Sequence, residues 1–147
     1  MEKTEQYRLL ERQVAALVEG ETDVIAKMAN IAAALHETFG FWWTGFYRVV
    51  GEELVLGPFQ GPVACMHIPF GKGVCGTAWK RNETVVVPDV EEFPGHIACS
   101  SASKSEIVVP VHGTGGEVTA VLDIDSDRLA TFDEEDRVWL EKIVTLL

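Results

Sequence analysis

Apolar residues recur with a helical period near both ends of the chain. Four of them share one face of a predicted N-terminal helix that stops near Gly20: Tyr7, Leu10, Val14 and Leu17. A second helix is expected from about residue 22 to 39, closed by Gly40, with an apolar face of Val24, Ile25, Met28, Ile31, Ala32 and Leu35. The last helix begins at the N-cap Asp133, and its apolar stripe comprises Val138, Leu140, Ile143, Val144 and Leu147. We interpret all three stripes as packing surfaces.

The middle of the chain has the patterns of β-structure. Six segments rich in β-branched and aromatic residues are predicted as strands: 42–50, 53–59, 66–68, 84–87, 107–111 and 117–124. Turns at Gly51 and at 113–116 join the first and last pairs into hairpins. Composition predicts loops at 57–65 and 95–106. This order predicts an α+β fold, in which an antiparallel sheet carries the N- and C-terminal helices on one face.

Composition excludes several classes of function. The chain has 147 residues, and we expect a single domain, residues 1–147, around one core. Twelve Lys and Arg against 23 Asp and Glu give a net charge of −11, which argues against nucleic acid and against an anionic membrane surface as partners. The N-terminus has no pattern of a secretory signal, and no apolar run is long enough to cross a bilayer. We therefore expect a cytoplasmic location.

Three cysteines are the first candidates for chemistry. An odd number of thiols in a chain without an export signal favours reactive cysteines over a structural disulfide framework. Cys99 has His96 three residues before it and Glu106 seven after it, and ionisable surroundings of this kind are typical of reactive thiols. Cys75 follows a glycine turn near the start of a predicted short helix, where the helix dipole is expected to lower its pKa. Cys75 is therefore a rival to Cys99, and Cys65 is the third thiol.

A pair of carboxyls stands at the end of the last predicted strand. Asp123 and Asp125 are two residues apart, so they point to the same face of the sheet. Asp is depleted in strands, so the pair favours a functional interpretation, with a turn-forming or helix-preceding acid as the alternative.

The first predicted strand carries a dense group of aromatic residues. Strand alternation groups these rings by face: Trp43 with Tyr47, and Trp42 with Phe46. Core packing is one interpretation, and the wall of a small pocket is the other.

A thiol redox enzyme makes use of all these groups. One thiolate attacks an oxidised substrate and becomes a sulfenic acid, a second thiol condenses with it to a disulfide, and an external dithiol restores the enzyme. If the substrate is a sulfoxide, its oxygen must be protonated, and crowded, desolvated carboxyls keep a proton at neutral pH. A zinc site fits less well, because the thiols are far apart and only His96 and Cys99 form a close pair. A cysteine–histidine hydrolase would leave the other thiols and the acids unused.

Several segments carry a resemblance to a known family: Gly57-Pro58-Phe59-Gln60-Gly61, Ala64-Cys65, Gly73-Val74-Cys75-Gly76-Thr77-Ala78, Gly95-His96-Ile97-Ala98-Cys99, Ser103-Lys104-Ser105-Glu106-Ile107-Val108 and Leu122-Asp123-Ile124-Asp125-Ser126. They resemble the free methionine-(R)-sulfoxide reductases, which are single GAF-domain proteins. The resemblance runs from the second helix to the last. It is specific, because ordinary GAF domains share the fold pattern without these three cysteines.

The resemblance implies a GAF-like sheet of about six strands and a role for each candidate residue. Cys99 would be the nucleophile and Cys65 the resolving thiol, with Cys75 an auxiliary or alternative partner. The residues that would bind and protonate the sulfoxide oxygen are Glu106, Asp123 and Asp125. The residues that match aromatic positions at the methyl end of the substrate are Trp43 and Tyr47. The substrate would be the free amino acid as its R sulfoxide, thioredoxin would be the reductant, and we expect no cofactor and no metal.

A second hypothesis from another class is a GAF-type small-molecule sensor or regulatory module. Fold alone does not fix function, but three thiols and a carboxyl pair serve no purpose in a nucleotide pocket. The amphipathic helices leave the oligomeric state open between a homodimer and a monomer in which every stripe faces one core. The sequence also leaves open which disulfide forms first and which carboxyl donates the proton.

Overall fold

Six antiparallel strands form one curled sheet at the centre of the fold. The computed structural model describes residues 1–97, 99 and 102–147. Within this range the sheet has the order β3-β2-β1-β6-β5-β4. Its strands are β1 (Trp43–Val50), β2 (Glu53–Gln60), β3 (His67–Pro69), β4 (Val85–Val87), β5 (Ser105–His112) and β6 (Val118–Ser126). The predicted α+β class and the antiparallel sheet are confirmed.

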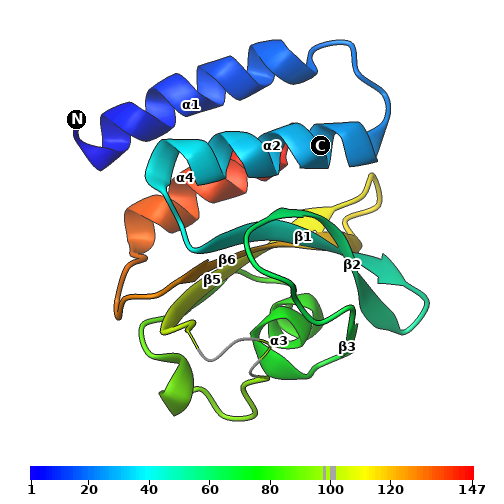
Figure 1. Cartoon of the computed structure of the whole chain (residues 1–147). Helices are drawn as coiled ribbons and strands as arrows, with labels where there is room; N and C mark the ends of the chain where they lie inside the picture. The colour runs from blue at the N-terminus through cyan, green and yellow to red at the C-terminus, as the bar shows by residue number, and fades with distance from the viewer. Residues whose placement is uncertain (98, 100–101) are drawn as a thin grey trace.

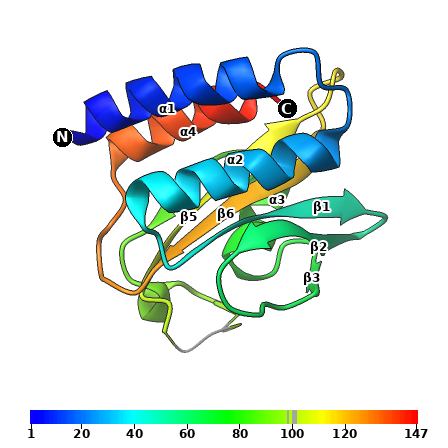
Figure 2. The same cartoon turned by 45° about the horizontal axis from the view of Figure 1, so that its top comes forward.

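The helices form layers on both sides of this sheet (Figure 1). One face carries α1 (Lys3–Val18), α2 (Val24–Phe39) and α4 (Glu134–Val144), as predicted for the terminal helices, and the other carries α3 (Gly73–Arg81). α1 packs mainly on α2 and α4, so it forms the outermost layer (Figure 2). Among the described residues, none of the helices combines the length and the apolar character needed to span a membrane.

Local signals set the ends of the helices. Asp23 caps α2 by accepting hydrogen bonds from the backbone N–H groups of Ile25 and Ala26. Gly40 ends the same helix in the left-handed conformation, with φ of 65°, as glycine does without steric cost. Asp133 begins α4 in a capping box with Asp136. The predicted helix ends at Gly40 and Asp133 are confirmed.

Alternation along the strands gives the sheet an apolar core on each face. Phe46 and Leu122 pack among the buried residues of α1, α2 and α4. Tyr47 and Val121, one position away in each strand, belong to a second cluster that includes residues of α3. The second face is the one that also carries polar groups.

One residue of the predicted N-terminal stripe lies outside the buried face of its helix. Leu17 is 55% exposed, and Val18 is buried in its place. At about 100° per residue, Val18 returns to within about 20° of Tyr7, whereas Leu17 lies about 80° away. Val24 and Ile25 are also exposed, because they form the first turn of α2, ahead of the buried stripe that starts at Met28.

Two predicted loops are shorter than expected. β2 continues to Gln60, because this part of the strand pairs with β1 through Gly45 and Phe59. Tertiary pairing thus overrides the turn-like composition of residues 57–60. β5 already begins at Ser105, which places Glu106 in a strand. The rest of the predicted loop at 95–106 is described at 95–97, 99 and 102–104, and residues 98, 100 and 101 lie outside the described residues.

Candidate active site

A disulfide joins two of the three cysteines. Cys65 lies between β2 and β3, Cys99 lies ahead of β5, and their Cα atoms are 5.4 Å apart. The bond connects two segments that are 34 positions apart in the sequence. Cys75 is the free cysteine, and it is buried in the first turns of α3. The fold therefore brings Cys65 and Cys99 into direct contact and holds Cys75 on a separate element.

Three carboxyls gather on the face of the sheet that α3 covers. In the antiparallel register of β5 and β6, Glu106 pairs with Asp125 and Val108 with Asp123. Directly opposite residues share a face, as do residues two apart, so all three acids project to the same side. Glu106 and Asp123 are 5% and 6% exposed. The same-face placement that the spacing of the two aspartates predicted is present.

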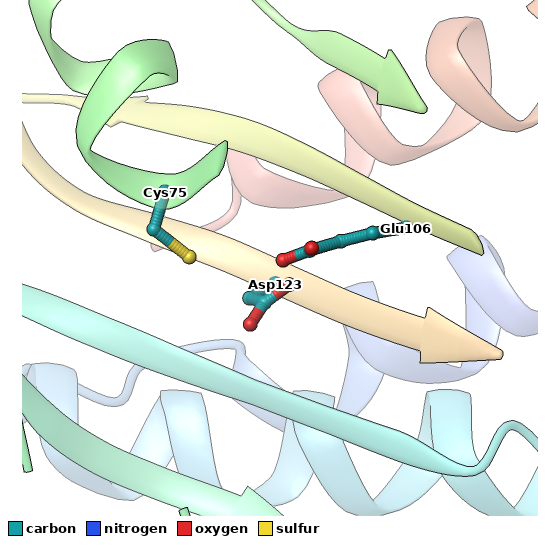
Figure 3. A group of neighbouring side chains, drawn as sticks. All are labelled: Cys75, Glu106 and Asp123. Atoms are coloured by element: carbon teal, nitrogen blue, oxygen red, sulfur yellow. The ribbon is translucent and has the colours of Figure 1, made fainter. Parts of the chain in front are cut away.

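Cys75 points into this carboxyl cluster (Figure 3). Its Sγ and one carboxylate oxygen each of Glu106 and Asp123 lie within 4.8 Å of one another. The prediction that the helix dipole lowers the pKa of Cys75 is wrong in sign. Burial, followed by the negative charges of Asp123 and Glu106, raises the pKa of this thiol well above its ordinary value. Desolvation of the buried thiol here outweighs the dipole of a helix of only about two and a half turns.

The environment of the carboxyls favours their protonated forms. Burial is the largest cause that raises the pKa of Glu106, and the neighbouring Asp123 and Asp125 add to it. Burial likewise raises the pKa of Asp123 and, well above its ordinary value, that of Asp125. Among the described residues, Asp123 Oδ1 is buried without a hydrogen-bond partner. The cluster can therefore hold a proton at neutral pH and offer it to a ligand.

Aromatic side chains of β1 also line the pocket, on the strand next to the aspartates of β6. Trp43 and Tyr47 both line it, with their ring centroids 6.0 Å apart. The indole N–H of Trp43 donates to the carbonyl oxygen of Pro62 at 2.9 Å. The hydroxyl of Tyr47 donates to the carbonyl oxygen of Cys65, also at 2.9 Å. These two bonds tie the aromatic wall to the segment that carries the first disulfide cysteine.

The pocket lining also includes residues without a role predicted from the sequence, among them Trp42, His96 and Ser103. Trp42 precedes β1, so strand alternation does not apply to it and does not place it with Phe46. Ser103 donates a hydrogen bond to Asp125 Oδ1 at 3.1 Å. His96 Nε2 lies 3.8 Å from Glu106 Oε1, and burial lowers the pKa of this imidazole. The spacing of His96 three residues before Cys99, noted in the sequence, was the signal for this imidazole.

Together these groups surround one small pocket. Its lining includes Cys75, Cys99 and all three carboxyls, and Cys65 lies at its edge through the disulfide. The pocket has about 550 Å³ of empty volume, part of which is open to solvent. It can accept a small molecule between aromatic rings, the disulfide sulfurs and a cluster of acids whose pKa values burial raises.

Comparison with known proteins first identifies the domain family to which the chain belongs. The family model of the GAF domain matches residues 20–147. A relative from Dictyostelium discoideum, GAF domain-containing protein A, is 57% identical over 99% of this chain and 92% of its own length. The chain is thus a GAF-domain protein with a thiol pair in its pocket.

Two other similar proteins narrow this class. The free methionine-R-sulfoxide reductase of Escherichia coli is 47% identical, over 100% of this chain and 89% of its own length. The crystal structure of the free methionine-R-sulfoxide reductase of Neisseria meningitidis in complex with its substrate is 51% identical, with a TM-score of 0.97 over 99% of this chain and 88% of that one. This protein belongs to the free methionine-R-sulfoxide reductase family.

Proposed function

We propose that this protein reduces free methionine-(R)-sulfoxide to methionine by thiol chemistry in the pocket described above. The observation that carries the proposal is the Cys65–Cys99 disulfide in the same pocket as a cluster of carboxyls whose pKa values burial raises. A sulfur nucleophile, a second thiol and an acid are the groups that sulfoxide reduction requires. The names of the relatives, including one crystallised with its substrate, give the same reaction for those proteins.

In the first half-reaction, Cys99 attacks the sulfur of the sulfoxide as a thiolate. A carboxyl of the cluster formed by Glu106, Asp123 and Asp125 donates a proton to the sulfoxide oxygen as the sulfur accepts electrons. The oxygen passes to Cys99, which becomes a sulfenic acid, and methionine leaves. The raised pKa of Glu106 supports this assignment, because a carboxyl that is ionised at neutral pH has no proton to give.

In the second half-reaction, the Cys65 thiol attacks the sulfenic sulfur of Cys99. The oxygen departs as water and the disulfide forms. Cys75 is a weaker candidate for this step, since the raised pKa of its thiol keeps it protonated. An external dithiol then exchanges with the disulfide and restores both thiols. Thioredoxin is our proposed reductant.

Trp43 and Tyr47 would hold the methyl end of the substrate against the aromatic wall. Burial raises the pKa of Tyr47, so its hydroxyl stays protonated and keeps its bond to the Cys65 carbonyl.

We also propose that residues 1–147 make up one GAF domain, that the protein acts in the cytoplasm, and that it forms a homodimer. The exposed Leu9 and Leu17 on the outermost helix support a homodimer, because a partner chain would cover them.

Replacing the two disulfide cysteines separately tests the proposal. Cys99→Ser should abolish methionine formation from the free R sulfoxide, even with a strong chemical reductant. Cys65→Ser should produce one methionine per chain and then stop when thioredoxin is the reductant. Full activity of Cys99→Ser would remove the proposal, and saturable nucleotide binding without sulfoxide turnover would favour a sensor instead.

A further inference from the structure

The Cys75 side of the pocket has the donors of a metal site. The Sγ of Cys75 comes from α3, and the oxygens of Glu106 and Asp123 come from β5 and β6, all within 4.8 Å of one another (Figure 3). Three protein donors of this mixed S and O type suit a borderline-soft cation, with a fourth position left open. Around a tetrahedral ion, donors at about 2.0 to 2.3 Å from the metal lie about 3.5 Å from one another, so shifts of about 1 Å would close the site.

A second observation points to a ligand at this place. Asp123 is 6% exposed and lines the pocket, yet its Oδ1 has no hydrogen-bond partner in the part of the chain that the structure describes. Buried polar atoms are nearly always paired, so an unpaired carboxylate oxygen indicates a missing partner. Within the same described residues, no lysine or arginine forms an ion pair with Glu106, Asp123 or Asp125.

We propose that Cys75, Glu106 and Asp123 form a binding site for a thiophilic divalent cation of the Zn²⁺ type. The cation replaces the thiol proton of Cys75 and any proton shared by the two carboxyls, which are released to solvent. His96, with Nε2 3.8 Å from Glu106 Oε1, is the nearest imidazole donor for the open position. A structural zinc site would need several thiols close together, whereas this site uses one thiol and two carboxylates.

The site overlaps with the groups that the proposed function assigns to the substrate. If the proposed function holds, the cation and methionine-(R)-sulfoxide compete for the same site, because Glu106 and Asp123 cannot bind the two ligands at once. Zn²⁺ would then inhibit turnover competitively, and a chelator would restore it. Metal binding itself is measured without substrate, so its outcome is independent of whether the protein reduces sulfoxides.

Cobalt titration of the oxidised protein tests the inference. With the Cys65–Cys99 disulfide intact, Cys75 is the thiol that remains, so any thiolate-to-Co²⁺ charge-transfer band must come from it. We expect this band at one Co²⁺ per chain, its loss on addition of Zn²⁺, and its absence in Cys75→Ser. The double variant Cys65→Ser/Cys99→Ser should retain the band.

A carboxylate variant keeps the test decisive if Cys75→Ser does not fold. Asp123→Asn should weaken Co²⁺ binding by at least about tenfold, because it removes a charged ligand. Asp127→Asn, at an exposed position just beyond β6, is the matched control and should bind as the wild type does. The inference is overturned by the absence of the band in oxidised wild type, by its persistence in Cys75→Ser, or by equal affinity in Asp123→Asn.

Discussion

Replacing Glu106 by glutamine should remove the acid of the pocket and at the same time stabilise the fold. Glutamine has nearly the same shape as a protonated glutamic acid and no ionisable proton. Glu106 is 5% exposed, and burial with Asp123 and Asp125 raises its pKa well above the ordinary 4.5. The raised pKa favours uptake of a proton by Glu106 on folding, and the variant needs no such uptake.

The size of this effect has a ceiling set by the pH. An unfolded glutamate with a pKa of 4.5 is ionised at pH 7, and each pH unit is equivalent to about 1.4 kcal/mol. Uptake of one proton thus costs at most (7.0 − 4.5) × 1.4, or about 3.5 kcal/mol. Because three carboxyls share protons in this cluster, we expect a gain of about 1 to 3 kcal/mol for Glu106→Gln, or about 3 to 10 °C in Tm.

The raised pKa of Glu106 also fixes the direction in which the stability of the fold changes with pH. Above pH 4.5 the folded protein binds more protons than the unfolded chain, so wild-type stability falls as the pH rises towards the raised pKa of the cluster. The advantage of Glu106→Gln should vanish below pH 4.5 and grow as the pH rises from there towards the raised pKa of the cluster. Turnover of methionine-(R)-sulfoxide should fall about 10²- to 10⁴-fold in the same variant.

Thermal unfolding of the disulfide-intact proteins, followed by circular dichroism from pH 4 to pH 8, measures the effect on stability. Glu52→Gln, at an exposed position in the turn between β1 and β2, is the matched control and should leave Tm unchanged. A Glu106→Gln protein less stable than wild type at pH 7 would refute the reasoning. An advantage that does not vary with pH would refute it as well.

Two further predictions concern tyrosine hydroxyls. Tyr47→Phe removes the hydrogen bond to the Cys65 carbonyl and should slow disulfide formation about tenfold, while the first half-reaction changes less. Single-turnover kinetics with quenched thiol alkylation would measure both steps. Equal slowing of both steps would contradict this. Tyr7→Phe removes a buried 2.5 Å hydrogen bond to Asp136 Oδ1 and should lower the free energy of unfolding in urea by about 1 to 3 kcal/mol. Activity per folded molecule should not change, because Tyr7 lies on the opposite side of the sheet from the pocket.

Features with local causes were predictable from the sequence. The capping aspartate Asp133 and the closing glycine Gly40 act within one helical turn, so the sequence beside them was sufficient. The shared face of Asp123 and Asp125 followed from the two-residue period of a strand. The antiparallel sheet with its terminal helices followed from the order of such elements.

Features that depend on distant partners were not predictable in this way. The pKa of Cys75 is set by burial against Asp123 and Glu106, which belong to other strands, and not by its own helix. At residues 57–59 the predicted strand and the predicted loop overlapped, and pairing with β1 decides for the strand. The contact of Cys65 with Cys99 joins two loops, and only the resemblance to a family implied it in advance.

Mapping the disulfide formed during one turnover tests the central claim most directly. Reduced protein is mixed with one equivalent of free methionine-R-sulfoxide, alkylated and digested, and its disulfide-linked peptides are identified by mass spectrometry. The S epimer serves as the control. We predict one methionine per chain and a new Cys65–Cys99 link with the R epimer, and neither product with the S epimer. Methionine formed without that link, or with a link that omits Cys99, would contradict the account.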